Sequence, residues 1–354
     1  MDFNKLKVVE LAGVLAGPSV GMFFAELGAE VIKIENERSG GDVTRSWKLA
    51  SEDKSSKVSA YFCSVNYHKE YQFKNLKEQR DLDKVRDLIR EADIVLVNFK
   101  KGDDVKLGLD YETLKKINPK IIYAAITGFG DESERIAYDL ILQAESGFMS
   151  MNGQESNPPT KMPVALIDVL AGHQLKEAIL IELLKQGENR KAVKLTVSLF
   201  DSALASLVNQ ASNYLMTGHV PKRIGSKHPN IAPYGEIFET QDGKLITFAI
   251  GSHTHFQKLC EYLGIGELAN DHRFSFNQNR VANRLELFEL LQNEISKKDS
   301  KIVDELNQVG VPSARIKSLD EVFQSEEAQN LVLEENIDGV ATKRVKSIVY
   351  KSYD

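Results

Sequence analysis

Three evenly spaced glycines near the start of the chain stand where a buried strand gives way to a helix. The apolar run 8–11 leads into Gly13, Gly17 and Gly21, and the residues that follow have the apolar spacing of a helix. Glycines at such a junction let an anion approach the free backbone N–H groups of a helix N-terminus. The spacing differs from the dinucleotide-binding pattern G-x-G-x-x-G. The residues alone therefore leave two interpretations open, a phosphate-binding turn or a tight packing turn in an α/β domain.

One carboxylate is the leading candidate for catalysis. Asp168 follows the apolar run 164–167 and precedes a predicted long helix over 169–186. An aspartate in this position is suited to accept a backbone N–H group as a helix cap. It is also suited to act as a nucleophile in acyl transfer, where a carboxylate forms a covalent intermediate. Residue type and position alone favour the cap.

The histidines and cysteines indicate no metal site and no disulfide framework. His253 and His255 lie two residues apart, but no third ligand accompanies them, so we expect no zinc site. Cys63 and Cys260 are far apart in the sequence and have none of the spacings of a zinc site or of a disulfide-rich domain.

The elements that must position these residues alternate short apolar runs with amphipathic segments. Strands are predicted over 8–11, 31–34, 94–97, 121–126 and 195–197, and helices over 20–27, 81–91, 111–117 and 169–186. Residues 50–66 are polar and are predicted to form a loop. This alternation is typical of an α/β fold with a mostly parallel, doubly wound sheet.

The second half of the chain has a different organisation. Residues 218–233 carry several glycines and prolines and are predicted to be a linker. Two strand-like runs follow, 234–238 and 245–250, with turn residues at 241–243 between them. Helices are predicted over 255–263 and 284–297. Residues 234–315 therefore form a candidate smaller α+β domain.

Composition and charge exclude several classes of protein. The chain has 354 residues, of which 42% are hydrophobic and 27% charged, with a formal net charge of −6. That charge argues against a general nucleic-acid surface, which needs a basic excess. No run of apolar residues is long enough for a membrane span, and the N-terminus lacks the apolar core of a signal peptide. We therefore expect a cytoplasmic protein of ordinary globular composition.

Motifs along nearly the whole chain resemble one protein family. VLAGPSVGMFFAELGAEVIKIE (14–35), followed by GGDVTRSW (40–47), resembles the opening of the family III CoA-transferases of the CaiB/BaiF type. That family includes formyl-CoA transferase, the carnitine CoA-transferases and α-methylacyl-CoA racemase. The resemblance continues, in the same order as in the family, through ADIVLVNFKKG (92–102), ITGFG (126–130), AYDLILQAESGFMSMNG (137–153), VALIDVLAGHQL (164–175), HPNIAPYGEIFETQDGKLITFAIG (228–251) and GVPSARIKSLDEVF (310–323).

The resemblance implies covalent CoA transfer between an acyl-CoA and a carboxylic acid. Asp168 matches the family's catalytic aspartate, which attacks the thioester and carries a mixed anhydride and then an aspartyl-CoA thioester. Coenzyme A is then a substrate, and no permanently bound cofactor is implied. The tetrahedral oxyanions formed on the way need N–H donors, and the turn 14–17 is expected to supply backbone donors.

The resemblance also implies which residues contact CoA. Arg38 and Lys106 would pair with its phosphates, Phe99 would cover the adenine or the pantetheine, and Asn98 would bind amides. Taken alone, each basic residue is as consistent with a solvated surface charge. The implied CoA-binding residues are Val14, Leu15, Arg38, Phe73, Asn98, Phe99, Lys106 and Tyr138.

Departures from the family pattern bear on which reaction, if any, the chain catalyses. Leu15 stands where formyl-CoA transferases have glutamine, which disfavours formyl-CoA or oxalate specificity. Tyr138 stands where the racemases have the histidine of a histidine–aspartate pair, and the pKa of an unperturbed tyrosine, near ~10, is too high for an efficient base. A non-catalytic CoA-binding homologue is a third hypothesis. The end of the chain at Tyr353-Asp354, before the family's usual Gly-Glu-His-Thr segment, supports that hypothesis, and the presence of Asp168 argues against it.

The family architecture implies a particular division of the chain. A Rossmann-like, CoA-binding large domain would comprise residues 1–217, with 316–354 returning to it. A linker over 218–233 would lead to the small α+β domain over 234–315. Family members form interlocked homodimers, so the expected partners are a second copy of the chain, an acyl-CoA and a small carboxylic acid, with no nucleic acid and no membrane.

Overall fold

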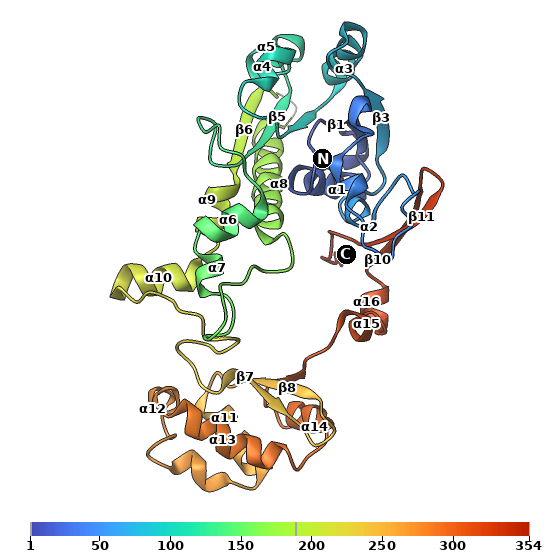
Figure 1. The fold of residues 1–354 in the computed structure, drawn as a ribbon. Coiled ribbons are helices and arrows are strands. Elements are labelled where there is room, and N and C mark those ends of the chain that lie inside the picture. The colour runs from blue at the N-terminus through green and yellow to red at the C-terminus, as the bar shows by residue number, and fades with distance from the viewer. Residues whose placement is uncertain (1, 188–189, 354) are drawn as a thin grey trace. The chain divides into compact units, whose positions relative to one another are not determined.

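The computed structural model describes residues 2–187 and 190–353 (Figure 1). These residues form two compact units. The first comprises residues up to 149, 161–220 and the segment from 327 onward, and the second comprises 150–160 and 221–326. The second unit contains the predicted small domain and most of the predicted linker. Residues 316–326, which the resemblance assigns to the large domain, also lie in the second unit.

A six-stranded parallel sheet forms the centre of the first unit. Its strand order is β3-β2-β1-β4-β5-β6, and every neighbouring pair is parallel. The strands are β1 (Lys7–Glu10), β2 (Glu30–Asn36), β3 (Glu70–Lys74), β4 (Ile94–Val97), β5 (Ile122–Thr127) and β6 (Val193–Ser198). The predicted α/β fold with a parallel sheet is confirmed. In this doubly wound order the chain reverses between β1 and β4, which places a crevice at the carboxyl ends of these two strands.

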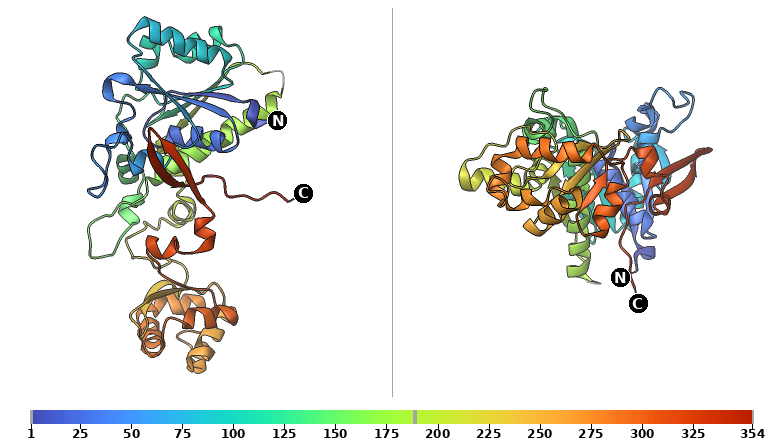
Figure 2. Two further views of the ribbon diagram at one scale, coloured as in Figure 1. Left: turned by 90° about the vertical axis from the view of Figure 1, so that its right-hand side faces the viewer. Right: turned by 90° about the horizontal axis from the view of Figure 1, so that it is seen from below.

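Helices cover both faces of this sheet (Figure 2, left). One face packs against α1 and α8 through residues such as Val8 and Leu96, and the other packs against α3 and α5 through residues such as Val9 and Val95. The α-helices as far as residue 217 are α1 (Ala16–Glu26), α2 (Ala60–Cys63), α3 (Gln79–Glu91), α4 (Asp103–Leu107), α5 (Tyr111–Ile117), α6 (Asp139–Glu145), α7 (Phe148–Met151), α8 (Leu166–Gln186), α9 (Leu199–Ala205) and α10 (Val208–Thr217). Short 3-10 helices are η1 (Phe3–Lys5), η2 (Glu37–Ser39) and η3 (Val43–Ser46).

The predicted strand bounds agree best with the structure where a strand is buried on both faces of the sheet. The predictions for β4 and α5 have the observed bounds, and those for β1, β2, β5, β6, α3 and α8 differ by a few residues. The predicted start of α1 at Val20 is wrong, because the helix begins at Ala16. Pro18 lies in its first turn, where the missing N–H group costs nothing. The predicted loop over 50–66 contains the short helix α2, and β3 was not predicted.

A C-terminal hairpin completes the first unit. It consists of β10 (Val332–Ile337) and β11 (Val340–Val345), which pair antiparallel, and it follows the short helix α16 (Glu326–Gln329). Two buried arginines connect the hairpin to the rest of the unit. Arg45 pairs with Asp338 of the hairpin at 3.0 Å, and Arg344 of the hairpin donates to the carbonyl of Asn66.

The second unit has its own core. A three-stranded antiparallel sheet in the order β7-β8-β9 contains β7 (Tyr234–Glu239), β8 (Leu245–Ala249) and β9 (Ser313–Arg315). It packs with the helical elements α11 (His253–Leu263), η4 (Gly266–Asn270), α12 (Asn277–Ala282), α13 (Arg284–Ile295) and α14 (Ile302–Gln308), and α15 (Leu319–Val322) follows. The predicted strand pair is confirmed. Across the two described ranges, no helix is both long enough and apolar enough to cross a membrane.

Candidate active site

Two glycines of α1, Gly17 and Gly21, are required by close packing. A Cβ atom added to Gly17 would lie 2.4 Å from the Cβ atom of Ala12, and one added to Gly21 would lie 1.8 Å from a carboxylate oxygen of Glu10. Real Cβ atoms do not approach other atoms this closely, so α1 can lie against the end of β1 only with glycine at both positions. The packing interpretation of the glycine spacing therefore holds at Gly17 and Gly21.

The turn that precedes α1 is held in a strained conformation. Val14 has a φ of 72°, a left-handed conformation that is costly for a β-branched residue. Its N–H group donates to the Asp42 carboxylate at 3.1 Å. On the other side of the turn, Asn98 accepts from the Gly13 N–H group at 3.1 Å and donates to the Gly13 carbonyl at 2.9 Å. Two side chains thus fix both residues of the turn.

This arrangement corrects the expected set of oxyanion donors. Because the Val14 N–H group already donates to Asp42, it is not available to a ligand. The N–H groups of Leu15, Ala16 and Gly17 have no acceptor within the described ranges. Unpaired N–H groups at the start of a helix form a ready anion site, which the positive end of the helix dipole strengthens.

A buried group of four charged side chains supports the same turn. The Lys33 ammonium donates to Glu10 and to the Ala12 carbonyl, both at 2.8 Å, and pairs with Asp42 at 3.1 Å. The Lys69 ammonium donates to Glu10 at 2.8 Å and to the carbonyl of Pro18 at 2.9 Å. The two ammonium groups therefore contact the chain just before α1, at Ala12, and within its first turn, at Pro18. We call these four residues, Glu10, Lys33, Asp42 and Lys69, the buried charge cluster.

The pKa values of the two lysines in this cluster shift in opposite directions. Burial by itself lowers the pKa of Lys33, but the negative charges of Glu10 and Asp42 outweigh it, so the pKa of Lys33 is raised. For Lys69, burial dominates over the attraction of Glu10 and lowers its pKa to about 8. Both lysines are therefore charged at neutral pH, and Glu10 faces two ammonium groups.

Asp168 does not cap its helix. Helix α8 begins at Leu166, so Asp168 lies in its first turn. The capping bond comes from a different helix: the Asp139 carboxylate accepts from the Ile167 N–H group at 2.7 Å. The interpretation of Asp168 as a cap, which its position favoured, is therefore wrong. One turn further along α8, a Cβ atom added to Gly172 would lie 3.2 Å from the Ala16 carbonyl, so α8 passes close to the start of α1.

The surroundings of Asp168 disfavour its ionised form. Only 8% of the residue is exposed. Burial, and then the negative charge of Asp139, raise the pKa of Asp168 to about 7. No group among residues 2–187 and 190–353 donates a hydrogen bond to its carboxylate. A desolvated carboxylate without donors is unstable when ionised, and it is a better nucleophile than a hydrated one.

Asp168 lines a cavity of about 630 Å³ at the carboxyl edge of the sheet. The walls are the start of α1, the segment after β4 and the loop over 127–138. Five of the residues implied to bind CoA line this cavity, namely Val14, Leu15, Asn98, Phe99 and Tyr138. Leu15 and Ala16, whose N–H groups are unpaired among the described residues, thus line the same cavity as the predicted nucleophile.

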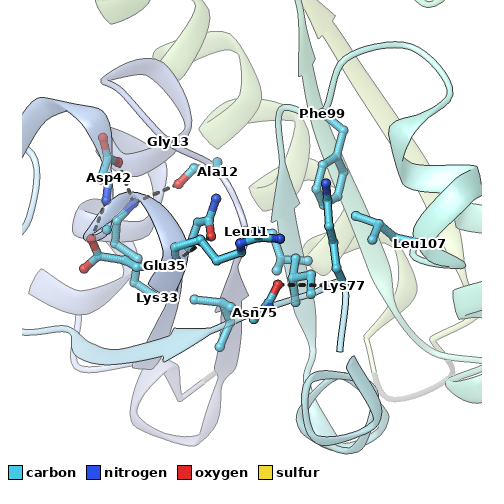
Figure 3. Close-up of a pocket in the computed structure, with 15 residues that line it drawn as sticks. Leu11, Ala12, Gly13, Lys33, Glu35, Asp42, Asn75, Lys77, Phe99 and Leu107 are labelled. Atoms are coloured by element: carbon cyan, nitrogen blue, oxygen red, sulfur yellow. Dashed lines mark hydrogen bonds and ion pairs between the residues drawn. The ribbon is translucent and has the colours of Figure 1, made fainter. Parts of the chain in front are cut away.

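A second cavity, of about 530 Å³, lies on the other side of Gly13 and Phe99, which line both cavities. Arg38 lines it, as the resemblance implied for a phosphate contact. Figure 3 shows Phe99 and Lys77 across the cavity from Asp42, with Asn75 at its lower edge. Arg38 and Lys77 therefore line a cavity that shares Gly13 and Phe99 with the cavity of Asp168.

Two of the implied CoA contacts lie elsewhere. Phe73 lines neither cavity, and its ring centroid is 5.5 Å from the guanidinium carbon of Arg45. Lys106 also lines neither cavity, and it pairs with Asp103 at 2.8 Å on the surface of α4. Asn75 and Lys77, which follow β3 in the chain, line the second cavity instead.

Several cations that line the first cavity were not among the residues predicted from the sequence. Each of them pairs with a nearby carboxylate. Lys101 pairs with Glu132 at 3.3 Å, Lys194 with Asp131 at 2.6 Å, and Arg135 with Glu145. An incoming anion could exchange with these carboxylates, which lie in or beside the loop over 127–138.

Comparisons with known proteins identify the family of this chain. The model of CoA-transferase family III matches residues 3–349. A succinate–glutarate CoA-transferase of Agrobacterium fabrum is 40% identical over 336 residues, which cover 92% of this chain and 82% of that protein. An acetyl-CoA:oxalate CoA-transferase of Acetobacter aceti is 36% identical, covering 88% of this chain and 79% of that protein. The crystal structure of a CaiB/BaiF family protein from Brucella suis matches with a TM-score of 0.84 and 38% identity, over 99% of this chain and 92% of that chain. The resemblance seen in the motifs is confirmed, and the chain belongs to family III of the CoA-transferases.

Proposed function

We propose that this chain transfers CoA between short dicarboxylic acids through an aspartyl-CoA thioester on Asp168. The observation that carries the proposal is the position of this carboxylate. It is 8% exposed, receives no hydrogen bond from the described residues and lines the same cavity as the unpaired N–H groups at the start of α1. The names of the relatives support the class of substrate, because they refer to succinate, glutarate and oxalate.

The proposed reaction consists of four acyl-transfer steps, two with the donor and two with the acceptor. The Asp168 carboxylate attacks the thioester carbonyl of the donor, and the C–S bond breaks to give a mixed anhydride and CoA thiolate. The thiolate attacks the aspartyl carbonyl, which releases the donor acid as a carboxylate and leaves Asp168 as a CoA thioester. The acceptor carboxylate attacks this thioester and forms a second anhydride. The thiolate then attacks the acceptor carbonyl, so that the new acyl-CoA leaves and the Asp168 carboxylate is restored.

Each exchange passes through a tetrahedral oxyanion. Donors that are already in place stabilise such a charge without reorganisation at the moment of reaction. The N–H groups of Leu15 and Ala16 are the proposed donors. Asp42 and Asn98 would hold these groups in position, because they fix the two residues that come before them in the turn.

The two cavities are the proposed binding site for CoA. Arg38 and Lys77 would contact phosphates at the basic end. The pantetheine arm would pass Phe99, which lines both cavities, and would place the thioester beside Asp168. Arg135 and Lys194 would meet the distal carboxylate of a dicarboxylic acid in the first cavity.

A labelled acid tests the covalent step directly. The enzyme is incubated with succinyl-CoA and with glutarate that carries the heavy oxygen isotope in both carboxylates. We expect glutaryl-CoA as product and heavy oxygen in the peptide that contains Asp168, because one acceptor oxygen remains on this carboxylate after each turnover. The Asp139 carboxylate serves as an internal control and should stay unlabelled. Turnover without label at Asp168 would contradict a covalent intermediate there.

Arg38 is expected to contribute to CoA affinity. Replacing it by alanine should weaken CoA binding by about 1–3 kcal/mol, the range of a charge-assisted contact. Isothermal titration calorimetry measures the change. Arg90→Ala is a matched control, because Arg90 is an exposed arginine that pairs with Asp87 on α3, outside both cavities. Equal CoA affinity in the two variants would show that Arg38 does not contact the ligand.

The rate of transfer should depend on the ionisation of Asp168. Its pKa is raised to about 7, and only the carboxylate form attacks, so kcat/KM should rise with pH through this value and then level off. Asp139→Asn keeps an oxygen acceptor for the Ile167 N–H group but removes the charge. It should therefore move the midpoint to lower pH. A pH profile that is the same in both enzymes would exclude this coupling.

The active form is proposed to be a homodimer with interlocked chains, as the family resemblance implies. One helix supports an interface between protein surfaces: α10 exposes 78% of Leu215 and 85% of Met216, and neighbouring apolar side chains of this size are unusual on a free surface. Interlocked chains cannot separate while folded. Light scattering and circular dichroism during dilution should therefore show no folded monomer, and the appearance of one would rule out interlocking.

A further inference from the structure

A cavity in the second unit contains a buried arginine that no carboxylate neutralises. We propose that this cavity, of about 520 Å³, binds a carboxylate on a short aliphatic chain. It lies in the unit that does not contain Asp168, so the inference goes beyond the function proposed above. It depends on Arg280, on the start of α11 and on the remaining lining residues.

Arg280 is a buried cation that has no carboxylate partner in the described part of the chain. Only 2% of the residue is exposed. Its Nε donates to the Ala232 carbonyl at 2.7 Å and its Nη1 to the Phe274 carbonyl at 2.9 Å, while Nη2 has no acceptor in the described part of the chain. The guanidinium carbon lies 4.7 Å from the centroid of the Phe256 ring. Carbonyls and an aromatic face orient the charge but do not neutralise it, and an uncompensated buried charge is costly.

Other arginines of the same unit show the usual alternative. Arg284 pairs with Glu236 at 3.1 Å, and Arg273 pairs with Asp271 at 2.5 Å. Across the described residues, Arg280 makes no such pair. Burial also lowers the pKa of Arg280, and no carboxylate acts to restore it. An external carboxylate would supply the missing partner by accepting from Nη2 in a charge-assisted hydrogen bond.

The start of α11 points to the same kind of ligand. Ser252 caps this helix of eleven residues by accepting from the His255 N–H group at 3.2 Å. The N–H groups of His253 and Thr254 have no acceptor within the described ranges, which leaves two donors at the positive end of a helix dipole. His253 lines the cavity, and its Nδ1 is buried without a hydrogen-bond partner. Two independent features, the helix start and Arg280, thus meet at one cavity.

The remaining lining favours a carboxylate with an aliphatic chain over a phosphate. Asn270 and Asn277 add neutral amides, and Ile231 and Ala269 add apolar surface. Among the lining residues of this cavity, Arg280 is the one side chain that is always charged. One planar cation matches one planar anion of single charge, and the apolar wall suits methylene groups.

A local fluorescent reporter makes binding at this cavity measurable. Trp47 is the single tryptophan of the chain and lies in the first unit. Phe276 lines the cavity and is 69% exposed, so a larger ring can replace it. The full-length Trp47→Phe, Phe276→Trp protein is titrated with sodium acetate, succinate and glutarate, and separately with sodium phosphate and chloride. We expect a saturable change in fluorescence with the carboxylates at concentrations at which phosphate and chloride give none.

Variants in this reporter protein test the residues. Arg280→Lys keeps the charge but loses the planar fork, and should raise the dissociation constant at least about tenfold. Arg273→Lys is the matched control and should leave it unchanged, since Arg273 already has carboxylate partners. If Arg280→Lys does not fold, His253→Ala should still weaken binding. Absence of saturation, saturation by phosphate but not by carboxylates, or equal affinity in all folded variants would overturn the proposal. Transfer activity is measured separately, so failure of the proposed reaction would not affect this result.

Discussion

Asp168→Asn is expected to fold and to lose transfer activity by at least about a thousandfold. The loss is large because the amide cannot form the anhydride or the thioester, so a covalent pathway is removed and not merely slowed. Asparagine has nearly the same size and shape, and Ile167 receives its capping bond from Asp139. The helix start should therefore remain intact. Mass spectrometry of the acyl-CoA products measures the rate, and activity within about tenfold of the unmodified enzyme would exclude Asp168 as the nucleophile.

The same substitution should stabilise the protein, in a way that depends on pH. Because the folded-state pKa of Asp168 is raised from 3.8 to about 7, the folded protein holds a proton that the unfolded chain releases. The charged carboxylate therefore costs free energy as pH rises between these two values, and the cost is complete above the higher one. Asparagine has no such cost. We expect Asp168→Asn to gain about 2–4 kcal/mol at about pH 8, and nothing at a pH below both values.

Urea unfolding at several pH values measures this gain. Asp201→Asn is a matched control, because Asp201 is an exposed aspartate in the first turn of α9. It should change neither transfer activity nor the pH dependence of stability. A stability difference between Asp168→Asn and the unmodified protein that does not change with pH would show that burial does not raise the pKa of Asp168.

Buried strands were predicted from the sequence, and one exposed edge strand was missed. β4 is apolar at every position because helices cover both faces of the sheet, and its predicted bounds are the observed ones. β3 lies at the edge of the sheet and consists of half-buried and exposed residues. Its sequence EYQFK alternates polar and aromatic residues with the period of a strand, but the run is short and polar, and it was not recognised. The same segment bears on the site. The resemblance implies a CoA contact at Phe73, in the segment that departs most from the family pattern, whereas Asn75 and Lys77 are the residues after β3 that line the second cavity.

The candidate nucleophile could be found from sequence, but its surroundings could not. Asp168 was recognised through its motif, whereas its position alone suggested a cap. That interpretation failed because Asp139, a residue of the separate helix α6, accepts the Ile167 N–H group at 2.7 Å and so supplies the capping bond. Contacts between distant segments leave no mark in local spacing. The pKa of Asp168 is raised by burial and then by the negative charge of Asp139, and both come from segments distant in the sequence.

The buried charge cluster did leave a signal in the sequence. Glu10 ends the run VVE, and VIKIE contains Lys33 and Glu35, so two otherwise apolar neighbouring strands carry charges that include an opposite pair, Glu10 and Lys33. In the parallel register of β1 and β2, Glu10 lies beside Lys33. A charge in a strand that is otherwise apolar is costly unless it is paired. Two such charges on neighbouring strands therefore indicate a buried pair.

Glu10→Gln is expected to destabilise the protein by about 3–5 kcal/mol, the cost of removing one partner from a buried ion pair. Glu10 has no exposed surface and accepts from the ammonium groups of both Lys33 and Lys69. With a neutral amide in its place, Lys33 keeps Asp42 as a partner, but Lys69 keeps only uncharged oxygen acceptors. The turn before α1 should loosen as well, because Lys33 and Lys69 hold the Ala12 and Pro18 carbonyls. Urea unfolding measures the loss of stability.

The loss of stability should depend on whether the carboxylate that is removed is buried or exposed. Glu91→Gln removes the partner of Lys7 in a pair of similar length, 3.2 Å, whose side chains are 44% and 73% exposed. Water solvates both groups of that pair, so its removal should change stability far less. If the two variants unfold at the same urea concentration, the lysines of the cluster are not charged in the folded protein. In that case Glu10 would not be the group that holds the start of α1, and transfer activity should survive Glu10→Gln.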